Sequence, residues 1–252
     1  MASAYLLVSH GSRDPRPEIA MQHLARLLCH KIQSDLPNIA IGGVASLSKS
    51  ASLVGTAYLE LSPDPLHEQI IKFAKNALES GCNSLRILPL FLLPGVHVME
   101  DIPAQVALAG QALGQDIKIY LQPYLGSHPD LGRLLAKQVV ATKAEAKILL
   151  AHGSRRPGGN TPVEAMATAI GAEVAYLAVP PSLEARVQEL IGDGYRNLLI
   201  IPYFLFAGGM TDAVAQRQQE LKLQFPEVNF QLVEPLGANA ELVELIWDLL
   251  EK

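Results

Sequence analysis

The sequence predicts an α/β protein of two similar domains, each an open parallel sheet built from βαβ units, that face a central cleft. Short apolar runs alternate with amphipathic helical stretches along the chain, which is typical of a parallel sheet. The first half of the chain also recurs, in altered form, in the second half. A chain of 252 residues, of which 49% are hydrophobic, is long enough for two ordinary cores.

The expected elements of the first half follow from its periodicity. Residues 4–9 are a short apolar run that indicates a buried strand, and residues 17–33 carry apolar side chains on one helical face. A strand over 55–61 precedes a helix over 65–80, which Gly81 closes as a C-cap. A third strand covers 84–93, and the next helix begins near Ile102 and Pro103, since proline suits a first turn. A strand over 117–122 and a helix over 131–142 complete this half.

The second half is expected to follow the same flavodoxin-like order. Its strands lie near 147–151, 173–179, 197–206 and 228–233, and its last helix covers 240–251. We place the boundary near residues 142–145, so that the domains cover 1–143 and 144–252.

Four segments of the first half return in the same order in the second. YLLVSHGSR (5–13) returns as ILLAHGSR (148–155), AYLE (57–60) as AYLA (175–178), LPLFLLPGVH (88–97) as IPYFLFAGGM (201–210), and YLGSH (124–128) as PLGAN (235–239). The framework persists, but the second copy has Ala178, Met210 and Asn239 in place of Glu60, His97 and His128. This pattern indicates one working site in the first half, with the second half forming the other wall of the cleft.

Three residues of the first half could form a metal site. His10 follows the first strand, Glu60 ends the second and His97 lies just past the third, and parallel strands bring these ends to one edge. Two imidazoles and a carboxylate suit iron, cobalt or nickel, with positions left free for a substrate. Either histidine alone could be a capping or solvent-facing residue, but the loss of His97 and Glu60 from the copy favours function. The retained His152 is interpreted as a turn residue, and the histidines at 23, 30 and 67 as surface residues.

Further residues could contact an anionic ligand. The turn Gly11-Ser12-Arg13 leads towards a helix, where backbone N–H groups favour anions, so Arg13 and its counterparts Arg155 and Arg156 would face carboxylates or phosphates. Ser12 could instead cap the helix. His128 could be a residue of the cleft rim or a helix-entry residue. The acids at 100 and 101 could be first-turn residues whose negative charge interacts favourably with the helix dipole.

Composition excludes several classes of protein. A net charge of −5 does not indicate binding to nucleic acid or to an anionic membrane. Two distant cysteines without a CxxC pair argue against a structural zinc site, an iron–sulfur cluster or a disulfide scaffold. No signal peptide or membrane span is expected, so we predict a cytoplasmic protein. His10 and Ala57 are 47 positions apart, against 23 for His152 and Ala175. Gly42–Leu53 holds much of this excess, as a solvated loop or a lid.

Taken together, these motifs resemble the sirohydrochlorin chelatases, a family of class II chelatases. The resemblance rests on VSHGSRD (8–14), YLE (58–60), PLFLLPGVH (89–97) with DIP (101–103), and LGSHP (125–129). It implies a chelatase-like fold and insertion of a divalent metal into sirohydrochlorin, a tetrapyrrole with eight carboxylates. It places His10 and His97 on the two metal-handling histidines and Glu60 on the acidic residue.

The same resemblance sets expectations about the metal and the assembly. The sequence lacks the histidine-rich tract and the C-terminal CxxC of the long cobalt-inserting members, which favours Fe²⁺ over Co²⁺. We expect no tightly bound cofactor, and a monomer with pseudo-twofold symmetry. Two alternatives remain: a histidine phosphatase, against which Ser9 in place of arginine counts, and a carrier of tetrapyrrole or metal that does not turn over.

Overall fold

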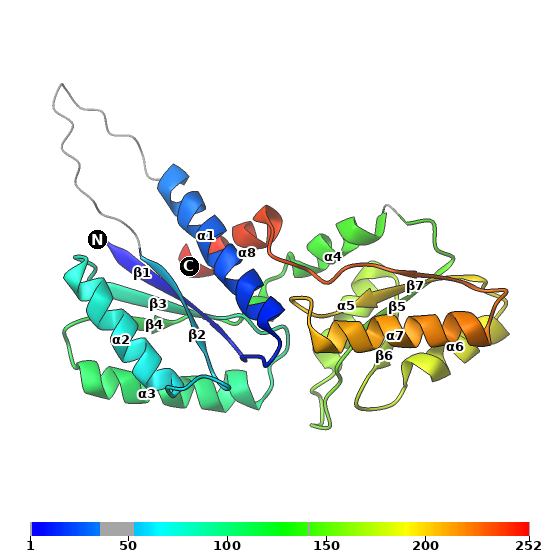
Figure 1. The fold of residues 1–252 in the computed structure, drawn as a ribbon, viewed down its shortest axis with the longest axis horizontal. Helices are drawn as coiled ribbons and strands as arrows, with labels where there is room; N and C mark the ends of the chain where they lie inside the picture. Colours follow the sequence, from blue (N-terminus) through cyan, green and yellow to red (C-terminus); the bar gives the residue numbers. More distant parts are fainter. Residues whose placement is uncertain (1, 36–52, 141, 252) are drawn as a thin grey trace, which may run out of the picture.

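The computed structural model describes residues 2–35, 53–140 and 142–251, which form two α/β halves side by side (Figure 1). The first half holds a four-stranded parallel sheet in the order β2-β1-β3-β4. Its strands are β1 (Ser3–Ser9), β2 (Val54–Tyr58), β3 (Ser84–Pro89) and β4 (Lys118–Leu121). Its helices are α1 (Pro15–Asp35), α2 (Leu66–Glu79), α3 (Ile102–Leu113) and α4 (Leu131–Val140), with a π-helical turn η1 (His97–Asp101) and a 3-10 turn η2 (Leu125–Ser127).

The second half repeats this arrangement. Its parallel sheet has the order β6-β5-β7-β8. The strands are β5 (Ala146–Ala151), β6 (Glu173–Tyr176), β7 (Asn197–Pro202) and β8 (Asn229–Leu232), and the helices are α5 (Thr161–Ile170), α6 (Leu183–Gly192), α7 (Gly209–Gln224) and α8 (Ala240–Glu251). The predicted α/β class with two parallel sheets is therefore confirmed.

Four strands end three or four residues earlier than the apolar pattern predicts. β2 ends at Tyr58 rather than at residue 61, and β6 ends at Tyr176 rather than at residue 179. β3 ends at Pro89 rather than at residue 93, and β7 ends at Pro202 rather than at residue 206. Beyond β3 the backbone turns from the sheet towards η2, where the N–H of Gly126 donates to the carbonyl of Phe91 at 2.8 Å. A side chain at Gly126 would place its Cβ only 2.0 Å from the carbonyl oxygen of Leu92, so this close approach requires glycine. The apolar residues after β3 line a cavity instead of extending the sheet.

The last helix of each half packs on the other half. α8 contacts α1 and β3 of the first half, whereas α4 contacts α5 of the second. Figure 1 shows α8 lying beside α1 at the top of the view, with α4 next to it above the second half. In each of the expected domains, 1–143 and 144–252, the last helix thus packs against the other domain.

This exchange joins the two halves through one continuous apolar core. A single cluster of buried side chains runs from Leu7 and Leu24 in the first half, through Leu135 and Ile246, to Leu149 in the second. Separate clusters fill the opposite faces of the two sheets, under α2 and α3 in one half and under α6 and α7 in the other. The two halves consequently meet as parts of one folded body.

Other expectations concern single segments. Of the proposed lid Gly42–Leu53, all but the last residue lies outside the described residues. Cys29 and Cys82 are both free thiols. No helix in the described parts of the chain is both long and apolar enough to cross a membrane.

Candidate metal centre between the two halves

The first strand and the second bring His10 beside Glu60. Ser9 and Tyr58 are register partners at the ends of β1 and β2, and the N–H of Glu60 donates to the carbonyl of His10 at 2.8 Å. Gly11 makes this approach possible: its φ is +97°, and a Cβ there would lie 2.1 Å from the Glu60 carbonyl oxygen. The Nε2 atom of His10 lies 3.7 Å from a carboxylate oxygen of Glu60, and both side chains are about half exposed.

The chain after β3 brings in His97. The rings of His10 and His97 meet edge to face, with centroids 5.0 Å apart. One possible ligand atom from each of His10, Glu60 and His97 lies within 4.8 Å of the others, and this is the one group of three or more His, Cys, Asp or Glu side chains with such geometry in the described residues. The three residues lie together as predicted, but His97 opens η1, eight positions after the end of β3, rather than following the strand directly.

Asp101 supports His97 from one turn further on. An oxygen of its carboxylate lies 2.7 Å from Nδ1 of His97. The two residues are the first and the last of the π-helical turn η1. A carboxylate on Nδ1 orients the ring, leaves Nε2 for a metal and raises the basicity of the imidazole. The sequence allows Asp101 to be a first-turn acid, and the H-x-x-x-D spacing of residues 97–101 is the signal that could indicate this contact.

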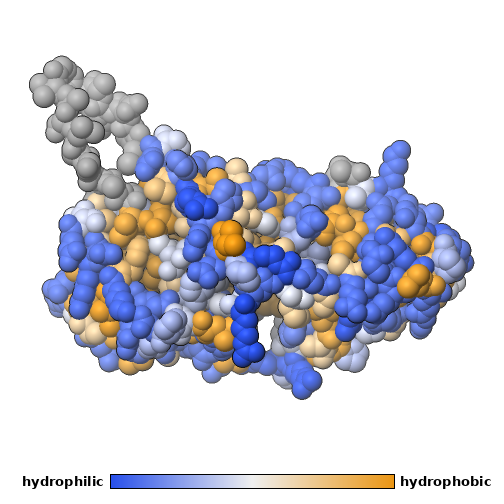
Figure 2. Space-filling view, viewed as in Figure 1, coloured by the Kyte–Doolittle hydropathy of each residue, from blue (hydrophilic) through white to orange (hydrophobic). Residues whose placement is uncertain are grey.

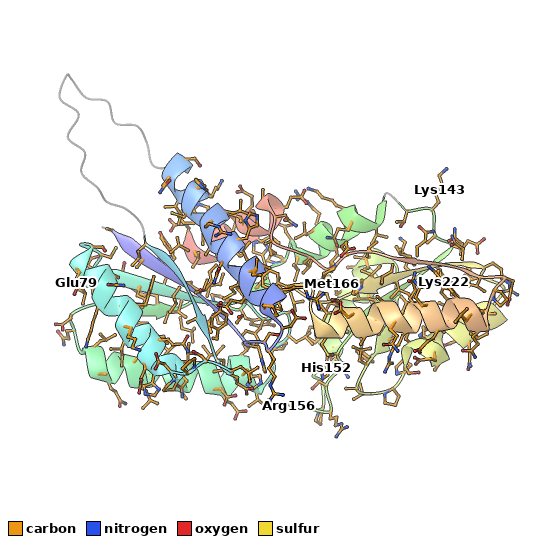
Figure 3. The ribbon with its side chains drawn as sticks, in the orientation of Figure 1. Glu79, Lys143, His152, Arg156, Met166 and Lys222 are labelled. Carbon is orange, nitrogen blue, oxygen red and sulfur yellow. The ribbon has the colours of Figure 1, made fainter. Side chains whose placement is uncertain are left out.

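A cavity of about 640 Å³, here called the large cavity, lies between the halves beside these residues. His10 and His97 line it from the first half, and His152 and Arg156 from the second. Its other lining residues are mostly apolar or glycine: 90–95, Met99, 153–154, 157–159 and 203–205. Figure 2 shows hydrophilic side chains around the notch between the halves at the bottom of the view, and Figure 3 shows His152 and Arg156 at this boundary.

A second cavity of about 270 Å³, here called the small cavity, also has His10 in its lining. It shares His10, Leu90, Phe204 and Leu205 with the large cavity. Its remaining lining residues are 9, 11–12, 17–18, 58, 61, 206 and 208–210. Leu61, directly after Glu60, has a φ of 58°, a left-handed conformation that is uncommon outside glycine.

Some of the residues expected to contact an anionic ligand line a cavity, and others do not. Ser12 lines the small cavity and accepts a hydrogen bond from the N–H of Asp14 at 3.0 Å, so it also caps its own turn. Arg156 lines the large cavity. Arg13 and Arg155 are exposed but line neither cavity, so the turn directs Arg156 rather than Arg155 towards the cleft.

His128 lies apart from the metal centre. Only 3% of it is exposed, its Nδ1 accepts from the N–H of Asp130 at 3.1 Å, and its Nε2 lies 3.6 Å from a carboxylate oxygen of Asp248 on α8. It lines neither cavity, so its position does not support a place on the cleft rim. The alternative of a helix-entry residue fits, because His128 lies three positions before the start of α4 and its carbonyl accepts from the N–H of Leu131 at 3.2 Å.

A family model named CbiX matches residues 4–142 and again 146–252. The chain belongs to the CbiX family. The double match agrees with the internal repeat, because one family unit covers each half of the chain. A sirohydrochlorin cobaltochelatase of Saccharolobus islandicus is 28% identical over 54% of this chain and 93% of its own length, so that relative corresponds to one such unit.

Other CbiX relatives span both halves. A sirohydrochlorin cobaltochelatase of Priestia megaterium is 22% identical over 98% of this chain and 78% of its own length. A sirohydrochlorin ferrochelatase of the same organism is 22% identical over 96% of this chain and 87% of its own length.

Solved structures share the fold of this CbiX chain. SirB from Bacillus subtilis with Fe³⁺ has a TM-score of 0.74 and 20% identity, covering 100% of this chain and 95% of that one. The sirohydrochlorin chelatase SirB of B. subtilis subspecies spizizenii in complex with cobalt has a TM-score of 0.72 and 20% identity, covering 100% and 94% of the two chains.

Proposed function

We propose that the protein inserts a divalent metal ion into sirohydrochlorin. The observation that carries this proposal is the open cluster of His10, Glu60 and His97 at the edge of a cavity lined by both halves. Three protein ligands leave coordination positions free, which suits an ion that must be passed on rather than retained. The family relatives named as cobaltochelatase and ferrochelatase support the same reaction class.

The reaction exchanges two protons for one metal ion. The metal ion forms bonds to the four ring nitrogens of the macrocycle, and the two pyrrole N–H groups lose their protons. Imidazole is the side chain whose ordinary pKa lies nearest neutrality, so His10 and His97 are suited to accept these protons. Asp101 would hold His97 in the orientation that presents Nε2 to the metal or to a pyrrole proton.

The large cavity has walls that fit a flat, anionic macrocycle. Phe91 and Leu92 come from the first half, and Tyr203 and Leu205 from the second, so apolar surface is available for the faces of the ring. Arg156 supplies positive charge for the carboxylates at the ring edge. In the structure it lies 3.5 Å from Glu100, an exposed ion pair that a substrate carboxylate could replace at small expense.

We expect Fe²⁺ from the sequence motifs, but the relatives carry both names and the ligand set discriminates weakly between iron and cobalt. An anaerobic absorbance assay with sirohydrochlorin and Fe²⁺, Co²⁺ or Ni²⁺ tests the reaction directly. A chelatase turns over many equivalents of macrocycle, whereas a carrier would bind one equivalent without accelerating insertion. Restoration of siroheme-dependent growth in a host without its own chelatase tests iron; rescue of cobalamin synthesis alone would indicate cobalt.

A further inference from the structure

His10 stands between two cavities rather than at the end of one. It lines both the large and the small cavity, whereas His97 lines the large cavity alone. The three residues that the cavities share with it, Leu90, Phe204 and Leu205, are apolar. Of the described residues in this shared wall, His10 is thus the one that can bind a metal ion.

The two cavities differ in charge. Apart from histidines, the charged residue among the described lining of the large cavity is Arg156, and that of the small cavity is Glu18. Arg156 is paired with the exposed Glu100, which a carboxylate of the macrocycle can replace, whereas Glu18 has no partner among the described Lys and Arg residues. The large cavity therefore offers a cation to the macrocycle, and the small cavity offers a carboxylate to a divalent metal ion. The sizes agree with this division, since the small cavity has less than half the volume of the large one.

Glu18 is available to attract a cation. It lies exposed in the first turn of α1, and no described Lys or Arg forms an ion pair with it. Its carboxylate accepts a hydrogen bond from the Gln22 amide at 3.3 Å. Glu18 and Tyr58 both line the small cavity, and burial raises the pKa of Tyr58, with the negative charge of Glu18 adding to that rise.

Arg16, two positions before Glu18 in α1, does not cancel this charge. Arg16 is held by two carboxylates, those of Asp14 and Asp212, so the three side chains together carry a net negative charge. Of these side chains, Asp14 lies near the small cavity, because its Oδ2 atom would be 3.9 Å from a Cβ at the lining residue Gly208.

We propose that the metal ion reaches His10 through the small cavity, past Glu18, while the macrocycle occupies the large cavity on the opposite side. An inserted ion must approach the ring nitrogens from one face of the ring, and a macrocycle in the large cavity would obstruct entry from that side. Separate entrances let both substrates be present at once. This inference rests on the proposed function and adds the route to it.

A charge substitution tests the role of Glu18. In the full-length protein with saturating sirohydrochlorin, Glu18→Gln should lower kcat/KM for Co²⁺ about three- to tenfold, because the entrance loses its attraction for cations. The kcat and the KM for sirohydrochlorin should not change. Glu68→Gln is the matched control, since Glu68 is an exposed acid in the first turn of α2 and lines neither cavity.

A pair of space-filling substitutions tests the route itself. Gly209 lines the small cavity and Gly95 the large one, and an added Cβ at either position meets no atom within 4 Å. Gly209→Phe should lower kcat/KM for Co²⁺ at least as far as Glu18→Gln does, without raising the KM for sirohydrochlorin. Gly95→Phe should raise the KM for sirohydrochlorin instead.

The outcomes separate the route from the reaction. If the wild type turns over but Glu18→Gln and Gly209→Phe both leave kcat/KM for Co²⁺ unchanged, the route is overturned and the proposed function stands. The route is also overturned if Gly209→Phe raises the KM for sirohydrochlorin, because the small cavity would then hold part of the macrocycle. A wild type without turnover would overturn the function and the route together.

Discussion

Asp101 holds His97 through a contact of 2.7 Å between its carboxylate and Nδ1, across a single π-helical turn. The spacing of four residues lets both side chains leave the same face of this turn. With Nδ1 occupied, Nε2 is the atom of His97 that remains for the metal centre. The π-helical turn therefore determines which nitrogen can bind.

We predict that Asp101→Asn lowers turnover or metal affinity by about tenfold to a hundredfold, as is typical when a carboxylate behind a metal-binding histidine is removed. The amide can still form a hydrogen bond but cannot stabilise a charged imidazolium. The variant should consequently change the pH dependence of kcat as well as lower its maximum value. Asp116→Asn, at an exposed turn after α3, is the control. An unchanged rate and pH profile in Asp101→Asn would show that the contact only stabilises the turn.

His10 and His97 should be far more sensitive than His152. Replacement of either of the first two by alanine should lower turnover by about a hundredfold or more, in the range of general acid–base effects, with the fold intact by circular dichroism. His152 lines the large cavity but has Ala178 and Met210 where the first half has Glu60 and His97. His152→Ala should therefore cost roughly tenfold or less. Equal losses for His10→Ala and His152→Ala would mean that both halves share one metal site.

Arg156 should affect binding of the macrocycle more than its conversion. Arg156→Gln should raise the KM for sirohydrochlorin about tenfold, the equivalent of losing one charge-assisted hydrogen bond, with little change in kcat. Glu100→Gln should lower the same KM slightly, because the arginine is released from its ion pair. Arg155→Gln is the control, since Arg155 lines neither cavity. Initial rates over a range of sirohydrochlorin concentrations measure KM and kcat for each variant.

Some parts of the site could be predicted from the sequence and others could not. His10 and Glu60 follow from the rule that parallel strands end on one edge of the sheet, and the decay of the repeat pointed to His97. The contact of Asp101 with His97 could not be predicted, because the expected helix begins at residue 102. A search for a period of 3.6 residues does not detect a π-helical turn that precedes the helix. His128 has lost its counterpart in the second copy as His97 has, so the repeat alone could not separate a site residue from a buried one.

The packing of α4 and α8 on the opposite halves could not be predicted from the sequence either. The apolar residues of α8 show that the helix is buried, but a repeat pattern does not say against which half. This matters for dissection of the protein. Removing everything after Thr142 would take away α8 as well as the second wall of the cleft. The first half would then expose its core, so loss of activity in that fragment would not by itself demonstrate a role for the second half in catalysis.

A single substitution in α8 tests the exchange. Ile246 is fully buried in the core that joins the two halves. Ile246→Ala should lower the free energy of unfolding by about 2–5 kcal/mol, the range for large-to-alanine changes in well-packed cores. Because α8 packs on α1 and β3, protection against hydrogen exchange should fall in the first half, 150 or more positions away in the sequence. Weakened protection confined to the second half would contradict the exchange.

Arg16 joins the halves beside the small cavity, and its contribution should depend on pH. It lies in α1 and forms ion pairs with Asp14 and with Asp212 of α7. The guanidinium lowers the pKa of Asp14 from 3.8 to about 2 and also lowers the pKa of Asp212. A carboxyl whose pKa falls on folding stabilises the folded state above its unfolded pKa and loses that contribution as the pH falls through the folded value.

Wild type should therefore be more stable than Arg16→Gln above about pH 4, and the difference should close as the pH falls towards 2. High salt should narrow it as well, because Arg16 and Asp212 are about half exposed and their attraction is screened. Thermal unfolding between these pH values measures the effect, with Arg26→Gln, an exposed arginine of the same helix, as the control. If the difference between wild type and Arg16→Gln were the same at every pH, the stabilisation would come from packing of the arginine stem rather than from its two carboxylates.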